Sequence, residues 1–197
     1  MPGARPSVMR WDVRAFDLFA PVYDRFMPPT DGVTLRKGLA VADREIDRIL
    51  EVGGGSGRVA REVGATVVDP ARGMLRRARR RGLETVQASA TDLPHPDGSV
   101  DAVVVIDAFH HFPAGQRCLS EMARVLAPGG VLVITDFDRG TRLGRALDLA
   151  ERCVGFDSTF CTASELEAAI ESTGLDARPI EYGFETTVAG VKPPTDR

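Results

Sequence analysis

A glycine-dense loop between a short apolar run and a helical pattern constrains this chain more than any other feature. The run ILEV at residues 49–52 precedes the loop GGGSG at residues 53–57, and a helical pattern covers residues 58–63. Glycines let the backbone adopt positive φ and approach a ligand without interference from a Cβ atom. The N-terminus of the following helix would add unpaired N–H groups and partial positive charge. Because open α/β folds bind nucleotides at such a strand–loop–helix, the sequence predicts a nucleotide site at this loop.

Strand-like and helix-like segments alternate along the rest of the chain, which predicts a mostly parallel sheet with helices on both faces. Strands are expected over residues 48–52, 66–69, 84–88, 101–106 and 131–137. Helices are expected over residues 9–27, 71–81, 114–126, 142–154 and 163–172. Two final strands over residues 178–182 and 185–191, joined through Gly183, predict an antiparallel hairpin. The predicted fold class is therefore α/β with a seven-stranded sheet.

Composition limits the class of protein. A chain of 197 residues, 43% apolar and 27% charged, is typical of one globular domain. The net charge of −3 gives no electrostatic reason to expect nucleic acid as a partner. No apolar run approaches the ~20 residues that span a bilayer, and the first ten residues lack the apolar core of a secretory signal. Three scattered cysteines fit a reducing compartment, so we expect a cytoplasmic protein.

Asp69 ends the second expected strand and precedes Pro70, which places its carboxylate at the carboxyl edge of the sheet beside the glycine loop. An acidic side chain there can accept hydrogen bonds from both ribose hydroxyls of an adenosine ligand. The alternative role is a cap for the helix over residues 71–81, because Asp is a favoured N-cap. Only twelve positions separate Gly57 from Asp69, so the intervening helix must be short.

Four motifs in order resemble a known family. The pattern E-x-G-x-G-x-G from Glu51 to Gly57 resembles motif I of the class I S-adenosylmethionine-dependent methyltransferases. Residues 68–75, 87–101 and 121–133 are similar to the family's later motifs, and together these segments span residues 46–137. The opening at residues 19–24, which includes Tyr23, resembles that of the group containing the ubiquinone and menaquinone C-methyltransferases.

This resemblance implies a Rossmann-like fold, S-adenosyl-L-methionine as the cofactor, and roles for particular residues. It implies that Glu51 attracts the methionine ammonium, that Asp69 binds the ribose and that Met74 flanks the adenine. The main chain near Asp107 would face the methionine half, and Tyr23 would reach the methionine carboxylate. The residues predicted to bind the cofactor are Tyr23, Glu51, Gly53, Gly54, Gly55, Gly57, Asp69, Pro70, Met74, Ser89, Ala90, Thr91, Asp92, Ile106 and Asp107.

The adenine contact departs from the family pattern. Ser89 stands where the family commonly has an aspartate that contacts the adenine amino group. Either Ser89 makes this contact or Asp92, three residues later, replaces it, and the sequence leaves both open. The backbone N–H of Ala90 would be available to the ring in either case.

Two adjacent histidines follow the strand over residues 101–106, where the family places its methyl acceptor. His110 or His111 could act as a general base if the acceptor must lose a proton. The alternative is structural, with one histidine packed under the following helix and the other capping it. Tyr23 is a further candidate at the reacting centre. A metal site is not expected, because no third ligand has suitable spacing along the chain.

The predicted protein is a single methyltransferase domain over residues 1–197 that acts on a small or hydrophobic acceptor. Residues 1–40 would form a helical cap, residues 46–137 the cofactor-binding core, and residues 138–197 the C-terminal helices and hairpin. One alternative is a non-catalytic module that binds the cofactor as a sensor or partner subunit. Another is a nicotinamide-dependent oxidoreductase, although its fingerprint would need a glycine where this chain has Arg58. The sequence does not indicate an oligomeric state.

Overall fold

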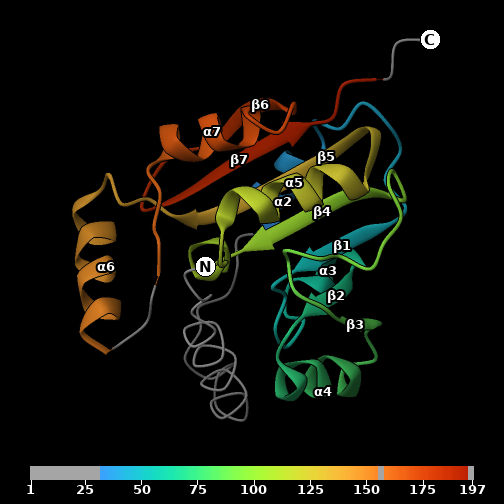
Figure 1. The fold of residues 1–197 in the computed structure, drawn as a ribbon, viewed down its shortest axis with the longest axis horizontal. Coiled ribbons are helices and arrows are strands. Elements are labelled where there is room, and N and C mark those ends of the chain that lie inside the picture. The colour runs from blue at the N-terminus through green and yellow to red at the C-terminus, as the bar shows by residue number, and fades with distance from the viewer. Residues whose placement is uncertain (1–31, 155–157, 195–197) are drawn as a thin grey trace, which may run out of the picture.

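The computed structural model describes residues 32–154 and 158–194 (Figure 1). The helix expected over residues 9–27, with Tyr23, lies outside the described residues, as does most of the expected cap over residues 1–40. The described part begins with the short helix α2 (Gly32–Leu39). No helix in the described part of the chain is both long enough and apolar enough to cross a bilayer.

The described residues form one sheet of seven strands in the order β3-β2-β1-β4-β5-β7-β6. Pairing is parallel from β3 through β5 and antiparallel where β7 meets β5 and β6, as the alternating pattern predicts. The strands are β1 (Ile49–Val52), β2 (Thr66–Asp69), β3 (Thr85–Gln87), β4 (Val100–Ile106), β5 (Leu126–Phe137), β6 (Asp176–Glu181) and β7 (Glu185–Val191).

Helices cover both faces of this sheet, and the alternation of side chains along β4 shows how. Val103 and Val105 pack in the core cluster under α5 (Gly115–Val125) and α7 (Ala163–Glu171). Ala102 and Val104 point the other way, into the cluster that contains Leu35 of α2. Successive residues of a strand point to opposite faces, so an apolar run such as that of β4 requires a helix layer on each side.

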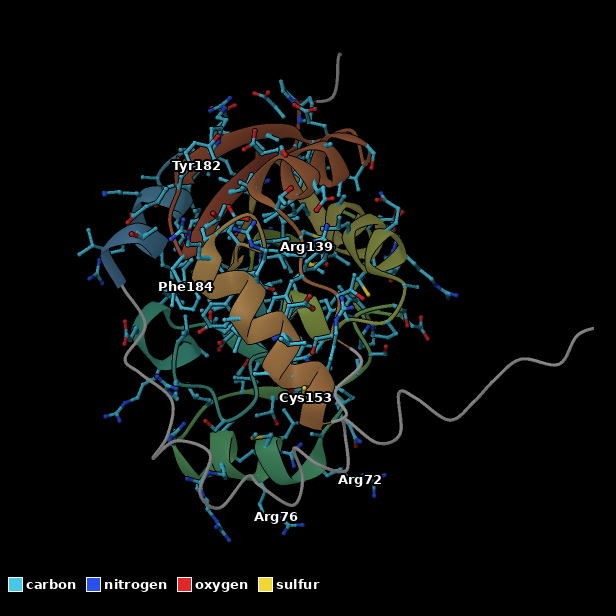
Figure 2. All side chains as sticks on the ribbon, turned by 90° about the vertical axis from the view of Figure 1, so that its left-hand side faces the viewer. Arg72, Arg76, Arg139, Cys153, Tyr182 and Phe184 are labelled. Atoms are coloured by element: carbon cyan, nitrogen blue, oxygen red, sulfur yellow. The ribbon has the colours of Figure 1, made fainter. Side chains whose placement is uncertain are left out.

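Two further helices flank the β1–β3 end of the sheet, and a third stands beyond its carboxyl edge. The single turn α3 (Ala60–Val63) and α4 (Arg72–Arg80) pack near β1, β2 and β3. Helix α6 (Arg142–Val154) stands beyond the ends of β4 and β5 in Figure 1. Viewed from that side in Figure 2, α6, with Cys153, crosses in front of the sheet. The four-residue α3 agrees with the short helix expected before Asp69.

Strand β5 begins earlier than the sequence predicts. The segment PGG at residues 128–130 was expected to end a helix at residue 126, with a strand from residue 131. In the structure α5 ends at Val125 and β5 starts at Leu126. The N–H of Gly129 donates to the carbonyl of Lys192 at 2.8 Å, and the N–H of Lys192 donates to that of Gly130 at 2.9 Å. These bonds tie the segment to the chain after β7. Gly129, with φ of +77°, bends it into a bulge, so the pairing with β4 shifts between Leu126 and Val131.

The last two strands form the predicted hairpin, in which β7 occupies the interior of the sheet and β6 the edge. β7 pairs with β5 along its whole length, from Phe137 opposite Glu185 to Val131 opposite Val191. β6 contains Pro179, which has no N–H to donate and is tolerated on an edge strand. The chain order of the parallel part reverses between β1 and β4, and open α/β sheets bind ligands at the carboxyl ends of strands at such a point.

Candidate functional site

The glycine loop follows β1 directly and lies at this switch point. Gly53, Gly55 and Gly57 all have positive φ, between +53° and +74°. A Cβ atom on Gly53 would lie 2.9 Å from the Cβ of Ala108 and from a ring carbon of Phe112. Among the described residues, only the sulfur of Met74, at 3.8 Å, comes within 4 Å of such an atom at Gly55. The loop therefore packs tightly at its start and is open at Gly55, where a ligand can approach the backbone.

Glu51 lies beneath the loop, with 3% of its surface exposed. Its Oε2 accepts a hydrogen bond from the N–H of Ala60 at 2.8 Å, which ties the loop to the start of α3. Burial raises the pKa of Glu51 to about 8, and this bond lowers it only in part. The predicted contribution of a helix N-terminus is small here, because α3 has one turn and its first N–H is bonded to Glu51.

Asp69 joins the loop to the next helix. Its Oδ2 accepts from the N–H of Gly55 at 3.0 Å, and its Oδ1 accepts from the N–H of Ala71 at 2.7 Å. Ala71, not Asp69, is the N-cap of α4, and no side chain caps this helix, so the expected capping role of Asp69 is wrong. The same bonds fix the carboxylate beside Gly55, at the carboxyl end of β2. The ribose contact stays a prediction.

The predicted adenine side contains a buried thioether and a polar turn. Met74 is buried on α4 with its sulfur near Gly55, while Pro70 is exposed. In the turn after β3, the hydroxyls of Ser89 and Thr91 lie 2.8 Å apart, and the N–H of Asp92 donates to the carbonyl of Ser89. Asp92 is exposed, Ser89 is half-buried and Ala90, between them, is buried. The choice between Ser89 and Asp92 remains open.

Asp107, directly after Ile106 at the end of β4, is the most strained residue of the site. Its φ is +50°, a region that L-residues other than Gly, Asn and Asp rarely adopt. Its N–H donates to the carbonyl of Thr135 at 3.0 Å, and its buried Oδ1 has no hydrogen-bond partner among the described residues. Burial, and next the charges of Glu185 and Asp136, raise its pKa to about 7. A buried acceptor without a partner is suited to accept a hydrogen bond from a ligand.

These elements fit the predicted cofactor. The open backbone at Gly55, the carboxylate of Asp69 and the unsatisfied oxygen of Asp107 lie at the carboxyl ends of β1, β2 and β4. An adenosine with a cationic amino-acid tail offers ribose hydroxyls and an ammonium group as donors to such acceptors. The structure thus brings the predicted residues of the described part to one edge of the sheet.

The first of the two histidines is buried and bonded to a carboxylate on the neighbouring strand. The Nδ1 of His110 lies 2.6 Å from Oδ1 of Asp136, and the backbone N–H of His110 donates to the other oxygen at 2.8 Å. Burial lowers the pKa of His110, but the charge and hydrogen bond of Asp136 outweigh it, so the pKa lies above its ordinary value. The ring stacks on Phe160 at a centroid distance of 4.3 Å.

The second histidine, His111, contacts Ser158 and the neighbouring His110. The Nδ1 of His111 lies 3.2 Å from Oγ of Ser158, and that hydroxyl also donates to Glu151 of α6. Burial, and next the neighbouring His110, lower the pKa of His111 to about 3.

Neither histidine caps α5, which follows Ala114 without a side-chain cap. His110 is buried, but its ring contacts Asp136, Phe137 and Phe160, which lie outside α5. The expected histidine cap of α5 is wrong.

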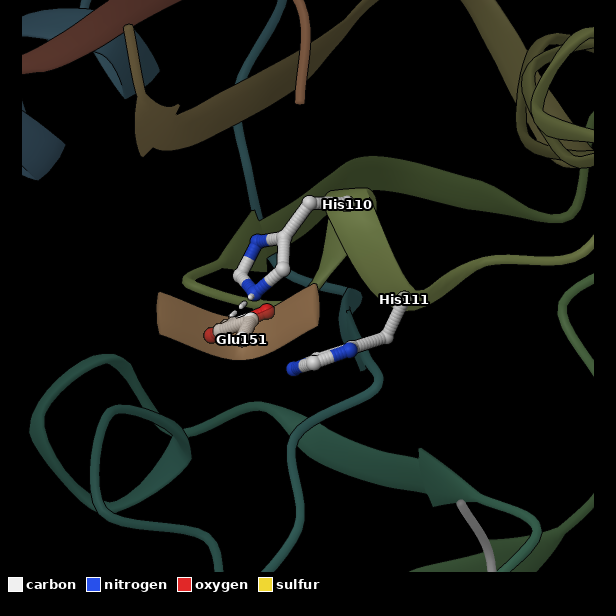
Figure 3. A group of neighbouring side chains, drawn as sticks. All are labelled: His110, His111 and Glu151. Carbon is white, nitrogen blue, oxygen red and sulfur yellow. Dashed lines mark ion pairs between the residues drawn. The ribbon is translucent and has the colours of Figure 1, made fainter. Parts of the chain in front are cut away.

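Figure 3 shows His110, His111 and Glu151 facing one another. One ligand atom from each lies within 4.8 Å of the other two. The prediction that no metal binds is based on spacing along the chain. The fold brings a third side chain, Glu151, to the two histidines, which that spacing does not reveal. Asp136, Glu151, Ser158 and Phe160 were not identified from the sequence. Of these only Asp136 carried a signal, an acid at the end of a buried strand.

Aromatic rings surround this cluster. Besides Phe160, the ring of Phe137 lies 6.0 Å from that of His110 and 5.0 Å from that of Phe184. A small cavity beside them is lined by residues that include Phe109, Phe137, Cys161 and Leu166. Asp136, Asp138, Thr162 and Thr186 also line this cavity, and its volume of about 10 Å³ is close to that of a single water molecule.

Comparisons with known proteins agree with this site. Residues 50–134 match the family model described as a methyltransferase domain. The demethylmenaquinone methyltransferase of Thermus thermophilus is 45% identical over 103 residues, which are 46% of this chain and 47% of the relative. The fatty-acid O-methyltransferase of Mycolicibacterium smegmatis is 42% identical over 108 residues, which are 49% of this chain and 39% of the relative. The chain thus spans less than half the length of these two relatives.

A solved structure extends the likeness to nearly the whole fold. The S-adenosylmethionine-dependent methyltransferase of Thermotoga maritima superposes with a TM-score of 0.77 at 25% sequence identity. The superposition covers 92% of this chain and 99% of that one. Residues 50–134 are therefore similar to a methyltransferase domain, and the fold is similar to that of a class I, S-adenosylmethionine-dependent methyltransferase.

Proposed function

We propose that the protein transfers the methyl group of S-adenosylmethionine to a small, hydrophobic acceptor at the carboxyl edge of the sheet. The observation that carries this proposal is the meeting of the open glycine loop, Asp69 and Asp107 at one edge, next to aromatic side chains. Two relatives are named for demethylmenaquinone and fatty-acid substrates, both largely apolar, which supports a hydrophobic acceptor.

In this proposal the described residues hold the cofactor in order along the edge. Gly53 to Gly57 approach the methionine half and the ribose, Asp69 accepts from the ribose hydroxyls, and Met74 packs against the adenine. Glu51 and Asp107 provide the acidic groups nearest the methionine ammonium. The sulfonium of the bound cofactor supplies an electrophilic methyl group, so the protein mainly aligns the acceptor and excludes water.

A label-transfer experiment tests the function. The protein is incubated with cofactor labelled in its methyl group and with fatty acids, reduced quinones and small phenols, and the organic extract is counted. We expect label in at least one of these acceptor classes and an equal amount of demethylated cofactor. Tight cofactor binding without transfer to any acceptor would instead support the sensor or partner-subunit alternative.

Replacing Asp69 by alanine is expected to weaken cofactor binding. The wild type should bind with a micromolar Kd, and the loss of a charged acceptor should raise this at least about tenfold. Isothermal titration calorimetry measures both values, with Asp43→Ala as the matched control at an exposed aspartate outside the predicted site. Unchanged affinity in Asp69→Ala would remove this carboxylate from the ribose site. A loss in Asp92→Ala would favour Asp92 over Ser89 at the adenine.

Cofactor affinity is expected to rise with pH through the titration of Asp107. Its pKa is about 7 without ligand, and an ammonium group prefers the ionised carboxylate. If only that form binds, affinity should increase about fivefold between about pH 6 and pH 7, before the cofactor's own amino group titrates. Calorimetry at several pH values measures this slope. Asp107→Asn should remove it, and an unchanged slope in the variant would assign it to another group.

We also propose that residues 46–137 form the cofactor-binding core and residues 138–197 its C-terminal cover, within one domain, and that the protein is cytoplasmic. Cys118, Cys153 and Cys161 are all free, which supports a reducing compartment.

A further inference from the structure

We propose that His110, His111 and Glu151 bind one divalent transition-metal ion of the zinc class. The two histidines lie on the 3-10 turn η1 (Phe109–His111) after β4, and Glu151 lies on α6. Two histidines and one carboxylate are a ligand set of catalytic zinc sites, in which a fourth position is left for water or substrate.

The three side chains lie near one another but farther apart than the ligands of a bound ion. The Nε2 of His110 lies 3.9 Å from Oε1 of Glu151 (Figure 3), and one atom from each of the three side chains lies within 4.8 Å of the others. Ligands about 2.1 Å from a tetrahedral ion lie about 3.4 Å apart. A shift of the Glu151 side chain by about half an ångström would reach this spacing for the first pair.

The hydrogen bonds fix which nitrogen of His110 can bind. Asp136 accepts from the backbone N–H groups of His110 and Phe137, as an ionised carboxylate does. Its bond with Nδ1 of His110 therefore requires the proton on Nδ1, and Nε2 carries the lone pair that faces Glu151. A carboxylate that orients a histidine through the nitrogen opposite the metal is a recurring feature of metal sites.

The same reasoning applies to His111. The hydroxyl of Ser158 has one hydrogen, and it donates this hydrogen to the carboxylate of Glu151. The contact between Ser158 Oγ and Nδ1 of His111 at 3.2 Å then requires Nδ1 as the donor, so Nε2 of His111 carries a lone pair. Ser158 thereby orients two of the three proposed ligands at once.

A proton and a metal ion would compete for this arrangement. A proton on Nε2 of His110 forms an ion pair with Glu151 at 3.9 Å, and a bound ion would replace that proton. Two imidazoles and a carboxylate within 4.8 Å of one another, each ligand oriented by a further hydrogen bond, match the chemistry of a cation site. If the acceptor is a hydroxyl compound, the ion would favour its deprotonated form. That consequence rests on the proposed function, whereas metal binding does not.

The experiment uses the full chain without an affinity tag, stripped with EDTA and dialysed. Titration with Co²⁺, followed by calorimetry and by visible absorption, is expected to show one ion per chain with a micromolar or lower Kd. Glu151→Gln and His111→Gln should each raise this Kd at least about tenfold, and Asp136→Asn about 10–100-fold. Circular dichroism and thermal unfolding identify any variant that fails to fold.

Two matched controls separate this site from adventitious binding. His95→Gln removes the other histidine of the chain, and Cys153→Ser removes an exposed thiol two residues from Glu151. Both should bind Co²⁺ as the wild type does. The proposal is overturned if the wild type binds no ion, if Cys153→Ser loses binding, or if Glu151→Gln and His111→Gln retain it.

Methyl transfer is measured separately, so the two proposals fail independently. Transfer that persists undiminished in EDTA, with no ion bound, would exclude a role for the ion in methyl transfer and leave the methyltransferase assignment intact. If His110→Gln then lowered the rate and changed its pH profile, His110 would act as a general base. Stoichiometric metal binding without label transfer would support the site and contradict the function.

Discussion

The ligand-free protein is expected to lose stability as the pH rises from about 5 to about 8. Replacing Glu51 by glutamine is expected to prevent most of this loss. Glu51 is buried beneath the glycine loop, and burial raises its pKa from 4.5 to about 8. The folded protein therefore keeps a proton that the unfolded chain releases above about pH 4.5. Stability falls with rising pH wherever the folded state binds more protons, so the window runs from about 4.5 to 8.

The size of this effect follows from the shift. A displacement of one pKa unit corresponds to about 1.4 kcal/mol, so Glu51 destabilises the fold by on the order of 3 kcal/mol more at pH 8 than at pH 5. Glutamine keeps an oxygen that can accept from Ala60 and does not ionise. Asp107, whose pKa is also raised, contributes in the same direction and is unchanged by this substitution.

Urea denaturation at several pH values measures the effect, with Glu171→Gln at an exposed position of α7 as the control. The wild type and the control should lose the same stability as the pH rises, and Glu51→Gln should lose less. A variant as pH-sensitive as the wild type would show that Glu51 is ionised in the fold. If the negative charge attracts the methionine ammonium, the same variant should bind cofactor more weakly.

Replacing Gly57 by alanine is expected to destabilise the protein by about 2–5 kcal/mol. The left-handed backbone costs an alanine roughly 1–2 kcal/mol, and overpacking adds about 1–3 kcal/mol. Gly57 has φ of +74°, and a Cβ atom there would lie 2.3 Å from Leu83 and 3.1 Å from Val67. The loop would have to move, so cofactor affinity should also fall.

Gly64→Ala is the matched control, because Gly64 has φ of +70° and open space where the Cβ atom would lie. It should show only the backbone cost, and the difference between the two variants isolates the packing around Gly57. Urea midpoints give the stability, and calorimetry gives the affinity. Equal losses of stability in both variants would mean that the side chain of Leu83 moves away from the new Cβ atom without an energetic penalty.

The sheet was predictable because its signals are local. Apolar runs identified the parallel strands. Glu51 in β1, the glycines after β1 and Asp69 at the end of β2 indicated the edge where the cofactor is predicted to bind. The beginning of β5 at Leu126 was not predictable, because the pairing around Gly129 and Gly130 depends on Lys192, far along the chain. Local preference indicated a turn there, and the structure contains it as a bulge within the strand.

The histidine cluster was only half predictable for the same reason. The pair His110 and His111 stands out in the sequence, but its partners come from β5 and α6 and from Ser158 after α6. Nothing in the spacing of Glu151 marks it as a neighbour of η1. The residues of this site follow different strands and meet only in the folded sheet, so the sequence alone does not show that they are neighbours.

The place of β7 between β5 and β6 also has a consequence for biosynthesis. While a ribosome is still making residues 138–184, β5 has a parallel neighbour on one side and an unpaired row of backbone groups on the other. Exposed strand edges recruit other chains, and domains emerge over many seconds of translation. Nascent chains of this protein should therefore depend on chaperones until residues 185–191 emerge.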